Sequence, residues 1–594
     1  MKNMFKTIAI ASVVLFGAVS CSDFLDRPAE DTYTESNFYA DDNQCIQGVN
    51  YLYNSPWYDV IRGFYRVGEC FSGNYFMGDS PYLQFNVNGS DKELRDMSAS
   101  LWAVNSHASV VYNRIKKSSG ITKEVKDMCL GETLVWKAYA YFFLVRTFGE
   151  VPIIHNISTE VAGGNYNNIY KAPKEDVYNY IVLVLEEAMN LLPKKVANKD
   201  GRIDYYSAKA LLAKVYLQKA GVTGTLNQAD LDKAAELAKD VIENSGRTLL
   251  ENYSDVFRMQ NNKNVEALIS WHWDASAQPW TAQNSFQSDL GMNGFDEFAD
   301  VWGQWNGPSV ALQDQFFDLS NTDGSLATLD PAQRSDSDTR RKATMMLPGD
   351  KYEYFWTTNG GFDYLRFFYD PDYGPSGTKN ASDGAMNSPT GAGCVKFLYG
   401  DGNDHMAALG VSAGRMAYGL STHILRLADV YLIYCEAKLH GPKTSTSDAL
   451  ALKCYNDVRR RAISSGYVDV TSITFEQVWK ERNLELALEG DRWYDYVRVG
   501  YYNPSFAVAD IQAQRRNALT GSNNKDLNSV YKSYYETGNW DATGISYNKD
   551  QYPIPSEDAI LSKIKALPFP SEDVVFNPHL EEEAQPFDLS TISF

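Results

Sequence analysis

The stretch SAKALLAKVYLQKAG (Ser207–Gly221), followed after a short loop by LDKAAELAKDVIENSG (Leu231–Gly246), decides the fold class. Both segments carry apolar residues three and four positions apart, which places them on one face of an α-helix. Small residues on these faces let the two helices approach closely, so the pattern predicts a tetratricopeptide-like hairpin. The residues expected on the inner faces are Ala208, Leu211, Leu212, Val215 and Tyr216 in the first helix and Ala234, Leu237, Ala238 and Val241 in the second.

The same helical spacing recurs elsewhere in the chain. A second hairpin is predicted over Ile424–Gly441 and Asp448–Ala462, and a third over Gly131–Phe148 and Pro173–Leu192, with a further helix over Leu101–Lys117. These units do not follow one another at a fixed period, which excludes a regular solenoid. The chain is therefore predicted to be mainly α, with the hairpins forming a frame.

Between residues 251 and 420 the helical pattern gives way to an irregular segment rich in Gly, Asn, Asp, Ser and Pro. A structureless loop of this length is improbable, so we expect an irregular lobe with few short strands that packs on the frame and carries the ligand site. Six of the 12 tryptophans lie in it: Trp271, Trp273, Trp280, Trp302, Trp305 and Trp356. The predicted regions are a helical N-terminal region at 36–250, the ligand lobe at 251–420, a helical hairpin and Glu-rich helix at 421–500, and an irregular C-terminal region at 501–594.

The composition restricts the possible partners. The 594 residues exceed the common domain size of ~100–150 residues several times, and 22% charged residues exclude wholesale disorder. Aromatic residues make up 13%, and tyrosine and tryptophan offer flat apolar faces with a polar handle, which suits flat, hydroxylated ligands. With 75 acidic against 55 basic residues, the net charge of −20 would repel phosphate backbones, so no nucleic acid partner is expected.

The N-terminus carries export signals. Met1–Ser20 has two early lysines and a short apolar run, which predicts a secretory signal peptide. The small residues before Cys21 resemble a lipobox, so we expect cleavage there and lipidation of Cys21, followed by a polar tether at 21–35. No later stretch is apolar for the ~18 residues that a membrane-spanning helix needs.

The six remaining cysteines lack CxxC spacing and indicate neither a zinc ribbon nor a disulfide scaffold. Cys435 and Cys454 lie in helical apolar patterns and are expected to be buried. One or two disulfides remain possible in an exported protein, and the sequence does not pair them.

Motifs for catalysis are mostly absent from the sequence. Only Gly410-Val411-Ser412-Ala413-Gly414 matches a nucleophile elbow, and that motif needs a strand directly before its serine. The preceding residues contain no β-branched run, so a glycine-rich loop is favoured over a hydrolase site.

The densest polar cluster is WKERNLELALEGDRWYDYVRVG (Trp479–Gly500), in which Glu481, Glu485 and Glu489 recur every four residues. Arg482, Arg492 and Arg498 are available as partners. A glycosidase needs two carboxylates across a cleft, whereas these three lie along one helical face, which favours a charge-paired structural helix.

The tryptophans divide into two groups. Trp136, Trp479 and Trp493 lie in helical apolar patterns and are expected in the core. Trp271 and Trp273 are typical of a short strand showing one face, and Trp302 and Trp305 lie in a glycine-containing loop. For each of these four, packing competes with ligand contact; as a group they are candidates for a ligand platform.

Several motifs together resemble the SusD/RagB family of surface lipoproteins, and the resemblance runs nearly end to end. The segments are CSDFLDRPAED after the signal, GETLVWKAYAYFFLVRTFGEVPII (Gly131–Ile154), RIDYYSAKALLAKVYLQKAG (Arg202–Gly221), RLADVYLIYCEA (Arg426–Ala437), YNDVRRRA (Tyr455–Ala462), WKERNLELALEGDRWYDYVRVG and QYPIPSED (Gln551–Asp558). The chain departs from the family at its end, where VVFNPHLEEEAQPF keeps only Asn577-Pro578 of a QNPGY-like stretch.

The resemblance implies a non-catalytic protein that captures oligosaccharides and acts as the lid of a SusC-like TonB-dependent outer-membrane transporter. Some branches of the family bind peptides, and this alternative stays open, as does, less favoured, a surface hydrolase. The resemblance also implies a cell-surface position on the outer membrane, no cofactor, and an open question about a structural calcium. Starch-binding relatives stack sugar on a Trp three residues before an Asn near the start of an early helix, which makes Trp102 and Asn105 candidates here, with plain packing as the alternative.

Overall fold

The computed structural model describes residues 38–275, 284–296, 306–317, 328–334, 336–375, 386–441, 444–522 and 525–594. The predicted signal peptide at 1–20, the lipidation site Cys21 and the tether at 21–35 lie outside the described residues. Within the described ranges, no helix is long and apolar enough to cross a membrane.

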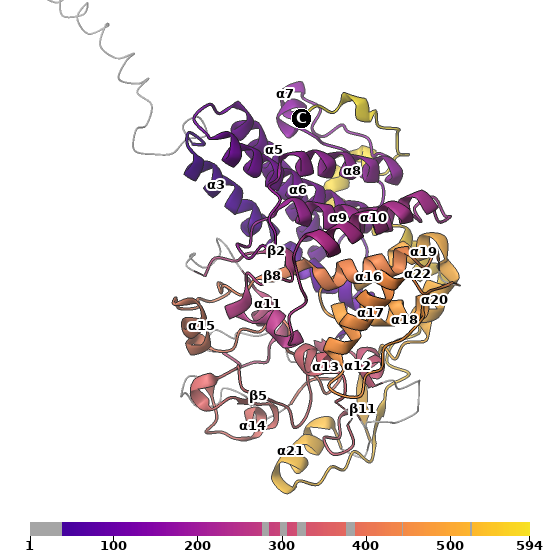
Figure 1. Cartoon of the computed structure of the whole chain (residues 1–594). Coiled ribbons are helices and arrows are strands. Elements are labelled where there is room, and N and C mark those ends of the chain that lie inside the picture. The colour runs from indigo at the N-terminus through magenta and orange to yellow at the C-terminus, as the bar shows by residue number, and fades with distance from the viewer. Residues whose placement is uncertain are drawn as a thin grey trace, which may run out of the picture.

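The first half of the chain forms a layer of helices, in which each helix packs on the next one along the chain. This layer lies at the top of Figure 1. The predicted hairpin of Ser207–Gly221 and Leu231–Gly246 is confirmed as α9 and α10, and α6 packs on α8 as the third predicted hairpin. The helices are α3 (Asp42–Asn50), α5 (Lys92–Lys117), α6 (Lys123–Phe148), α8 (Lys174–Leu191), α9 (Tyr205–Lys219) and α10 (Gln228–Asn244).

Local chemistry fixes the ends of the α9–α10 hairpin. Asp204 caps α9 because its carboxylate accepts a hydrogen bond from the Ser207 amide, 2.8 Å away. The same side chain pairs with Arg247 just after α10, 3.0 Å away, so one buried carboxylate ties the start of one helix to the end of the other.

Helix α6 is the centre of this layer. Every residue from Cys129 to Phe148 is buried, as its almost uniformly apolar sequence predicts. The helix ends at Gly149, whose φ of 74° lies in a region that favours glycine.

A second helical group packs against the first. Helix α16 contacts both α9 and α10, and so joins the two groups into one frame. The prediction of a helix from Ile424 was wrong at its start, because residues 422–426 form a strand that pairs with β2 before the helix begins. The elements are β8 (Thr422–Arg426), α16 (Leu427–Ala437), α17 (Ala449–Ala462), α18 (Phe475–Leu486) and α19 (Arg492–Tyr502).

The segment 251–420 forms the loop-rich lobe at the lower left of Figure 1. Strand β2 (Ala267–Trp271) pairs antiparallel with β8 and so connects the lobe to the frame. The lobe's other strands form isolated pairs. Strand β3 (Asn306–Pro308) pairs with β1 (Tyr75–Met77) of the N-terminal region, β4 (Met345–Met346) with β7 (Gly393–Cys394), and β5 (Lys351–Tyr352) with β6 (Phe362–Asp363). Its short helices are α11 (Phe286–Leu290), α12 (Val310–Phe317), α13 (Arg340–Thr344), α14 (Tyr364–Tyr369) and α15 (Gly402–Leu409).

The C-terminal region is more helical than expected, although long irregular segments separate its helices. Helix α21 contacts α14 of the lobe, whereas α22 contacts α19 and α20 of the frame. The chain end then returns to the first helical layer, beside α7 (Ile157–Gly163) in Figure 1. The elements are α20 (Pro504–Gln512), β11 (Leu519–Gly521), α21 (Leu527–Thr537), β12 (Ile545–Tyr547), α22 (Glu557–Lys565) and α23 (Ser571–Phe576).

The six cysteines after residue 21 are all buried and unpaired. The prediction that Cys435 and Cys454 are buried is therefore confirmed, and neither of the disulfides left open by the sequence forms in this structure. Burial raises the pKa of each of these thiols, so they pack as small apolar groups.

Candidate functional site

The pairing of β1 with β3 lies beside a cavity whose wall carries several charged and polar side chains. Tyr75 lies opposite Pro308 and Met77 opposite Asn306, so this short ladder joins the N-terminal region to a segment more than 200 residues away. A turn after β1, closed by a hydrogen bond from the Ser80 amide to the Met77 carbonyl at 2.9 Å, then leads the chain back toward α5.

The cavity beside this ladder has a volume of about 570 Å³, and we name it the strand-edge cavity. Its polar lining comes from five separate places in the chain, namely the π-helical turn before β1, the turn after it, the start of α5, the start of β3 and the segment before α22. The residues used below are Arg66, Asp79, Asp91, Glu93, Asn306 and Tyr552.

The start of α5 fixes two of these carboxylates. Asp91 caps the helix by accepting a hydrogen bond from the Leu94 amide, 2.9 Å away, and the same oxygen accepts one from the Tyr82 hydroxyl, 2.6 Å away. Two residues later, Glu93 lies 2.8 Å from an Arg66 guanidinium nitrogen. Because Asp91 and Glu93 are each held by these partners, the remaining lone pairs of the two carboxylates keep fixed directions.

Elsewhere in the lining, the Tyr552 hydroxyl donates a hydrogen bond to Asp79, 2.6 Å away. Burial, together with this hydrogen bond, raises the pKa of Tyr552 to about 12, so the phenol stays protonated at neutral pH. Asp79 is exposed and Tyr552 is half-buried, so the pair presents a carboxylate beside part of an aromatic ring.

This arrangement suits a ligand with many hydroxyl groups. Carboxylates accept hydrogen bonds, guanidinium and amide groups donate them, and a hydroxyl does both at once. Asn306, half-buried at the start of β3, adds an amide that can do either. A single anion or cation would meet charges of both signs here.

The family of the chain follows from its match to known sequences. The model described as the SusD family matches residues 244–583, which is more than half of the 594 residues. The chain belongs to the SusD family. A second model, described as starch-binding and associating with the outer membrane, matches residues 101–217, so the two matches cover both the frame and the lobe.

The chain is similar along its whole length to other SusD-like proteins. A SusD-like protein of Bacteroides ovatus is 29% identical over 98% of both chains. A crystal structure solved with a xylogluco-oligosaccharide is 26% identical, covers 92% of this chain and 99% of its own, and superposes with a TM-score of 0.72. A laminarin-binding SusD-like protein is 23% identical over 79% of this chain and 93% of its own, with a TM-score of 0.56, and shares the fold.

The SusD-family fold places Trp271 and Trp273 in the core. The prediction of a strand here is confirmed for Trp271, which ends β2, but the two side chains are only 0% and 5% exposed. The Trp271 ring lies 5.5 Å from those of Trp57 and Phe64, and the Trp273 indole donates a hydrogen bond to Thr422 at 3.0 Å. Of the two alternatives left open by the sequence for each residue, packing is the one seen here, because β2 is covered on both faces.

Trp102 and Asn105 also lie away from the strand-edge cavity. Helix α5 begins at Lys92 and not at Leu101, because Asp91 caps it, so Trp102 lies well inside the helix. Trp102 is half-buried with its ring edge against Tyr141, and the Asn105 amide donates to the Ile154 carbonyl at 3.2 Å. The expected helix-start position was wrong, and both residues contact the helical layer.

The two other candidate tryptophans, Trp302 and Trp305, lie outside the described residues. The residue after Trp305 is Asn306, which lines the strand-edge cavity. The core positions predicted for Trp136, Trp479 and Trp493 are confirmed, since all three are buried.

Sequence reasoning did not identify Arg66, Asp79, Asn306 or Tyr552. Tyr552 lies in the QYPIPSED segment, which served as evidence for the family but not for a ligand site. Asp91 and Glu93 are typical of a helix start and could have placed the beginning of α5 correctly. The sequence would then have pointed to this end of the helix as part of a candidate site.

The prediction of a charge-paired helix is confirmed for Glu481 and Glu485 in α18, although their partners differ from those expected. The placement of Glu489 on the same helical face was wrong, because α18 ends at Leu486 and Glu489 lies in the turn after it. Arg482 is one position past Glu481 and therefore points to a different face, where it pairs with Asp429 and Asp495 at 2.8 and 3.1 Å. The three glutamates are buried and bind cations from other elements. The contacts are Glu481 with Arg340 and Arg459, Glu485 with Arg340, Arg426 and Arg461, and Glu489 with Arg426 and Lys396.

The Gly410–Gly414 motif follows a helix and not a strand. Gly410 ends α15 with a φ of 71°, and the exposed Ser412 lies in the loop beyond it. The glycine-rich loop predicted from the sequence matches this geometry, whereas a nucleophile elbow needs a strand before the serine. In the described ranges, no group of three or more His, Cys, Asp or Glu side chains is placed to hold a metal ion.

Proposed function

We propose that this protein is a non-catalytic lipoprotein of the outer cell surface, which binds oligosaccharides in the strand-edge cavity. It delivers them to a SusC-like TonB-dependent transporter, on which the helical frame docks so that the protein acts as a lid. One observation carries the proposal: a cavity lined by donors and acceptors of both signs beside a partly exposed aromatic ring, in a chain similar over 92% of its length to a protein solved with a xylogluco-oligosaccharide.

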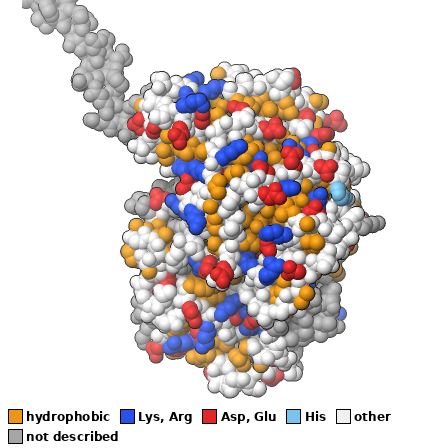
Figure 2. Space-filling model, viewed as in Figure 1, with side chains coloured by type: hydrophobic (Ala, Val, Ile, Leu, Met, Phe, Trp, Pro, Cys, Tyr) orange, Lys and Arg blue, Asp and Glu red, His pale blue; other side chains and the backbone are white. Residues whose placement is uncertain are grey.

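The chemistry of the cavity supports a sugar as its ligand. Sugar hydroxyls would bond to Asp79, Arg66 and Asn306, while an apolar sugar face packs on an aromatic ring. We propose that Trp302 and Trp305, which precede Asn306 in the sequence, supply further stacking rings. Figure 2 shows charges of both signs interspersed over one face of the molecule, in keeping with a neutral ligand.

The binding role without catalysis is supported by the position of the acidic residues. Glu481, Glu485 and Glu489 are buried and each is bound by two or more cations, so they cannot flank a sugar as a pair of glycosidase carboxylates would. Ser412 has no strand before it to present it as a nucleophile.

The binding site is tested by substitution of Asp79. Asp79→Ala should weaken oligosaccharide binding at least ten-fold, about 1.4 kcal/mol, because it removes an acceptor and frees the Tyr552 hydroxyl. Trp302→Ala combined with Trp305→Ala should have a similar effect. The measurement is calorimetric titration with xyloglucan, laminarin and starch fragments, with circular dichroism to verify the fold.

Asp550→Ala, an exposed carboxylate close to Tyr552 in the sequence, is the matched control and should bind like the parent. Equal affinity of Asp79→Ala and the parent would place the site elsewhere. If the parent protein binds peptides and no sugar, its ligand is a peptide, the alternative ligand class for this family, and the glycan proposal is wrong.

The lipid anchor is a separate prediction. Acylation requires the Cys21 thiol, so Cys21→Ala should move the protein from the membrane fraction to the soluble fraction of a cell lysate. Cys45→Ala, which changes a buried thiol of α3, should leave the protein in the membrane fraction. Membrane association of Cys21→Ala that still requires detergent for release would contradict lipidation.

A further inference from the structure

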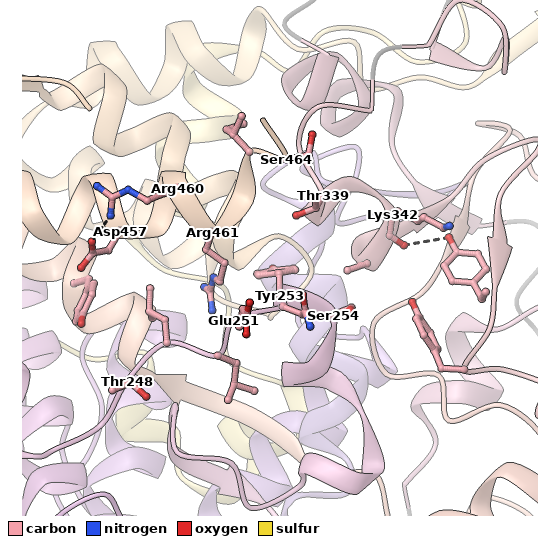
Figure 3. Close-up of a pocket in the computed structure, with 18 of the residues that line it drawn as sticks. Thr248, Glu251, Tyr253, Ser254, Thr339, Lys342, Asp457, Arg460, Arg461 and Ser464 are labelled. Atoms are coloured by element: carbon pink, nitrogen blue, oxygen red, sulfur yellow. Dashed lines mark hydrogen bonds and ion pairs between the residues drawn. The ribbon is translucent and has the colours of Figure 1, made fainter. Parts of the chain in front are cut away.

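A second cavity lies where the lobe meets the frame, and it shares no lining residue with the strand-edge cavity. We name it the frame–lobe cavity. Its volume is about 1130 Å³, and its walls come from the segment after α10, from α13 and β5, and from α17. Figure 3 shows the labelled side chains of these segments surrounding the same space.

Three charged side chains of this cavity have no ion-pair partner among the described residues. Lys342 and Glu353 come from the lobe and Glu251 comes from the segment after α10, and all three are exposed. The Lys342 ammonium lies 5.3 Å from the centre of the Tyr352 ring, a contact that leaves its hydrogen-bond donors available. The cavity thus offers one cationic donor and two anionic acceptors to a ligand.

A buried cation forms part of the cavity wall. Arg461 of α17 lines the cavity with only 4% of its side chain exposed, and its two terminal nitrogens bind Glu266 and Glu485. Its third nitrogen, Nε, is buried without an acceptor in the described part of the chain. Since this N–H has almost no accessible surface, Arg461 contributes positive charge and a fixed wall to the cavity, and the cationic donor that can reach a ligand is Lys342. In Figure 3 the Arg461 side chain reaches toward Glu251 and Tyr253.

Aromatic surface is also present. Tyr354 is half-buried, with the Arg258 guanidinium 4.0 Å from its ring centre. Tyr253 and Tyr352 are buried, and their hydroxyls donate to the Glu485 and Lys342 carbonyls, so these rings form rigid walls.

These features select the class of ligand. An anion would face the two unpaired carboxylates of Glu251 and Glu353, and a cation would face Lys342 and the Arg461 guanidinium. A neutral molecule with many hydroxyl groups can bond to Glu251, Glu353 and Lys342 at once. We propose that the frame–lobe cavity is a second oligosaccharide-binding site, which rests on the proposed function and extends it.

Two sites on one chain would hold two parts of one glycan, or two glycans, at the same time. If one polysaccharide spans both cavities, the second contact becomes intramolecular and raises the overall affinity for long chains over short ones. The strand-edge cavity alone would not favour length in this way.

The test separates the two sites by substitution in the full chain. The first variant, Asp79→Ala, weakens sugar binding in the strand-edge cavity. The second is a triple variant that combines Asp79→Ala with Glu251→Ala and Lys342→Ala. Both added positions are exposed, so the fold should survive, as circular dichroism can verify. The matched control adds Lys233→Ala and Glu236→Ala, an exposed pair on α10. Each protein is titrated with xyloglucan, laminarin and starch fragments in a calorimeter.

We expect Asp79→Ala to bind the sugars weakly and the control to bind them with the same affinity. The triple variant should bind them at least ten-fold more weakly than Asp79→Ala. Equal residual binding in the triple variant and the control would overturn the second site and leave the first intact. The complete loss of binding in Asp79→Ala would overturn it as well. If the parent binds none of the sugars, both proposals are overturned. If Asp79→Ala binds as tightly as the parent and the triple variant loses this binding, the second site is supported and the first is overturned.

Discussion

Glu485→Ala should lower the free energy of unfolding by about 3–5 kcal/mol, because it leaves buried arginine cations without their anionic partner. Glu485 is fully buried and forms ion pairs with Arg340 at 3.0 Å, with Arg426 at 2.5 Å and with Arg461. The three arginines come from α13, β8 and α17, so this carboxylate joins the lobe to the frame. The measurement is urea denaturation followed by circular dichroism.

Glu476→Ala is the matched control, since Glu476 is exposed in the first turn of the same helix, α18. We expect it to change the unfolding free energy by no more than about 0.5 kcal/mol. A Glu485→Ala variant as stable as this control would show that the buried network contributes nothing to stability.

The same network predicts a pH dependence. Burial alone would raise the pKa of Glu485, but the guanidinium groups of Arg461, Arg426 and Arg340 outweigh it and hold the pKa well below its usual range. A carboxyl whose pKa is lowered by folding stabilises the fold above its unfolded pKa of about 4.3, and this contribution is lost as the pH falls below it. The parent should therefore lose more stability than Glu485→Ala between pH 5 and pH 3, and parallel curves would contradict this.

Gly490→Ala should destabilise the protein by about 2–5 kcal/mol, for two reasons that add. Gly490 has a φ of +77°, a conformation that costs other residues about 1–2 kcal/mol. A Cβ atom there would lie 2.5 Å from the Phe64 ring, which is itself packed against Trp271 and Phe286, and overpacking costs about 1–3 kcal/mol.

Gly164→Ala separates these two causes, because Gly164 has a φ of +72° but a Cβ atom added there would meet nothing within 4 Å. We expect only the backbone cost of about 1–2 kcal/mol from it. If urea denaturation gives the same decrease in unfolding free energy for both variants, the Phe64 ring moves away from the added Cβ atom at no energetic cost, which would contradict the overpacking contribution.

The helices of the frame could be predicted because their signals are local. The spacing in Ser207–Gly221 and Leu231–Gly246 gave the α9–α10 hairpin, and the uniformly apolar run before Phe148 gave a buried helix. Strand β8 could not be predicted in this way, because its partner β2 lies some 150 residues earlier in the chain. Read alone, ILRLADVY has a helical spacing through its first residues as well.

The candidate site was less accessible to sequence reasoning for the same reason. Trp271 and Trp273 have the alternation of a strand, but alternation does not tell whether both faces of that strand are covered. Asp79 and Tyr552 belong to irregular segments more than 400 residues apart, and only the fold makes them hydrogen-bond partners. Motifs identify the family, whereas the cavity is formed by long-range pairing.

The strand-edge cavity is the proposed binding site for oligosaccharides. A crystal structure of the protein with the fragment that binds most tightly among those of xyloglucan, laminarin and starch tests it most directly. We expect a sugar within hydrogen-bond distance of Asp79, Arg66 or Asn306. A sugar bound at neither these residues nor Tyr552, with the strand-edge cavity filled only by water, would contradict it.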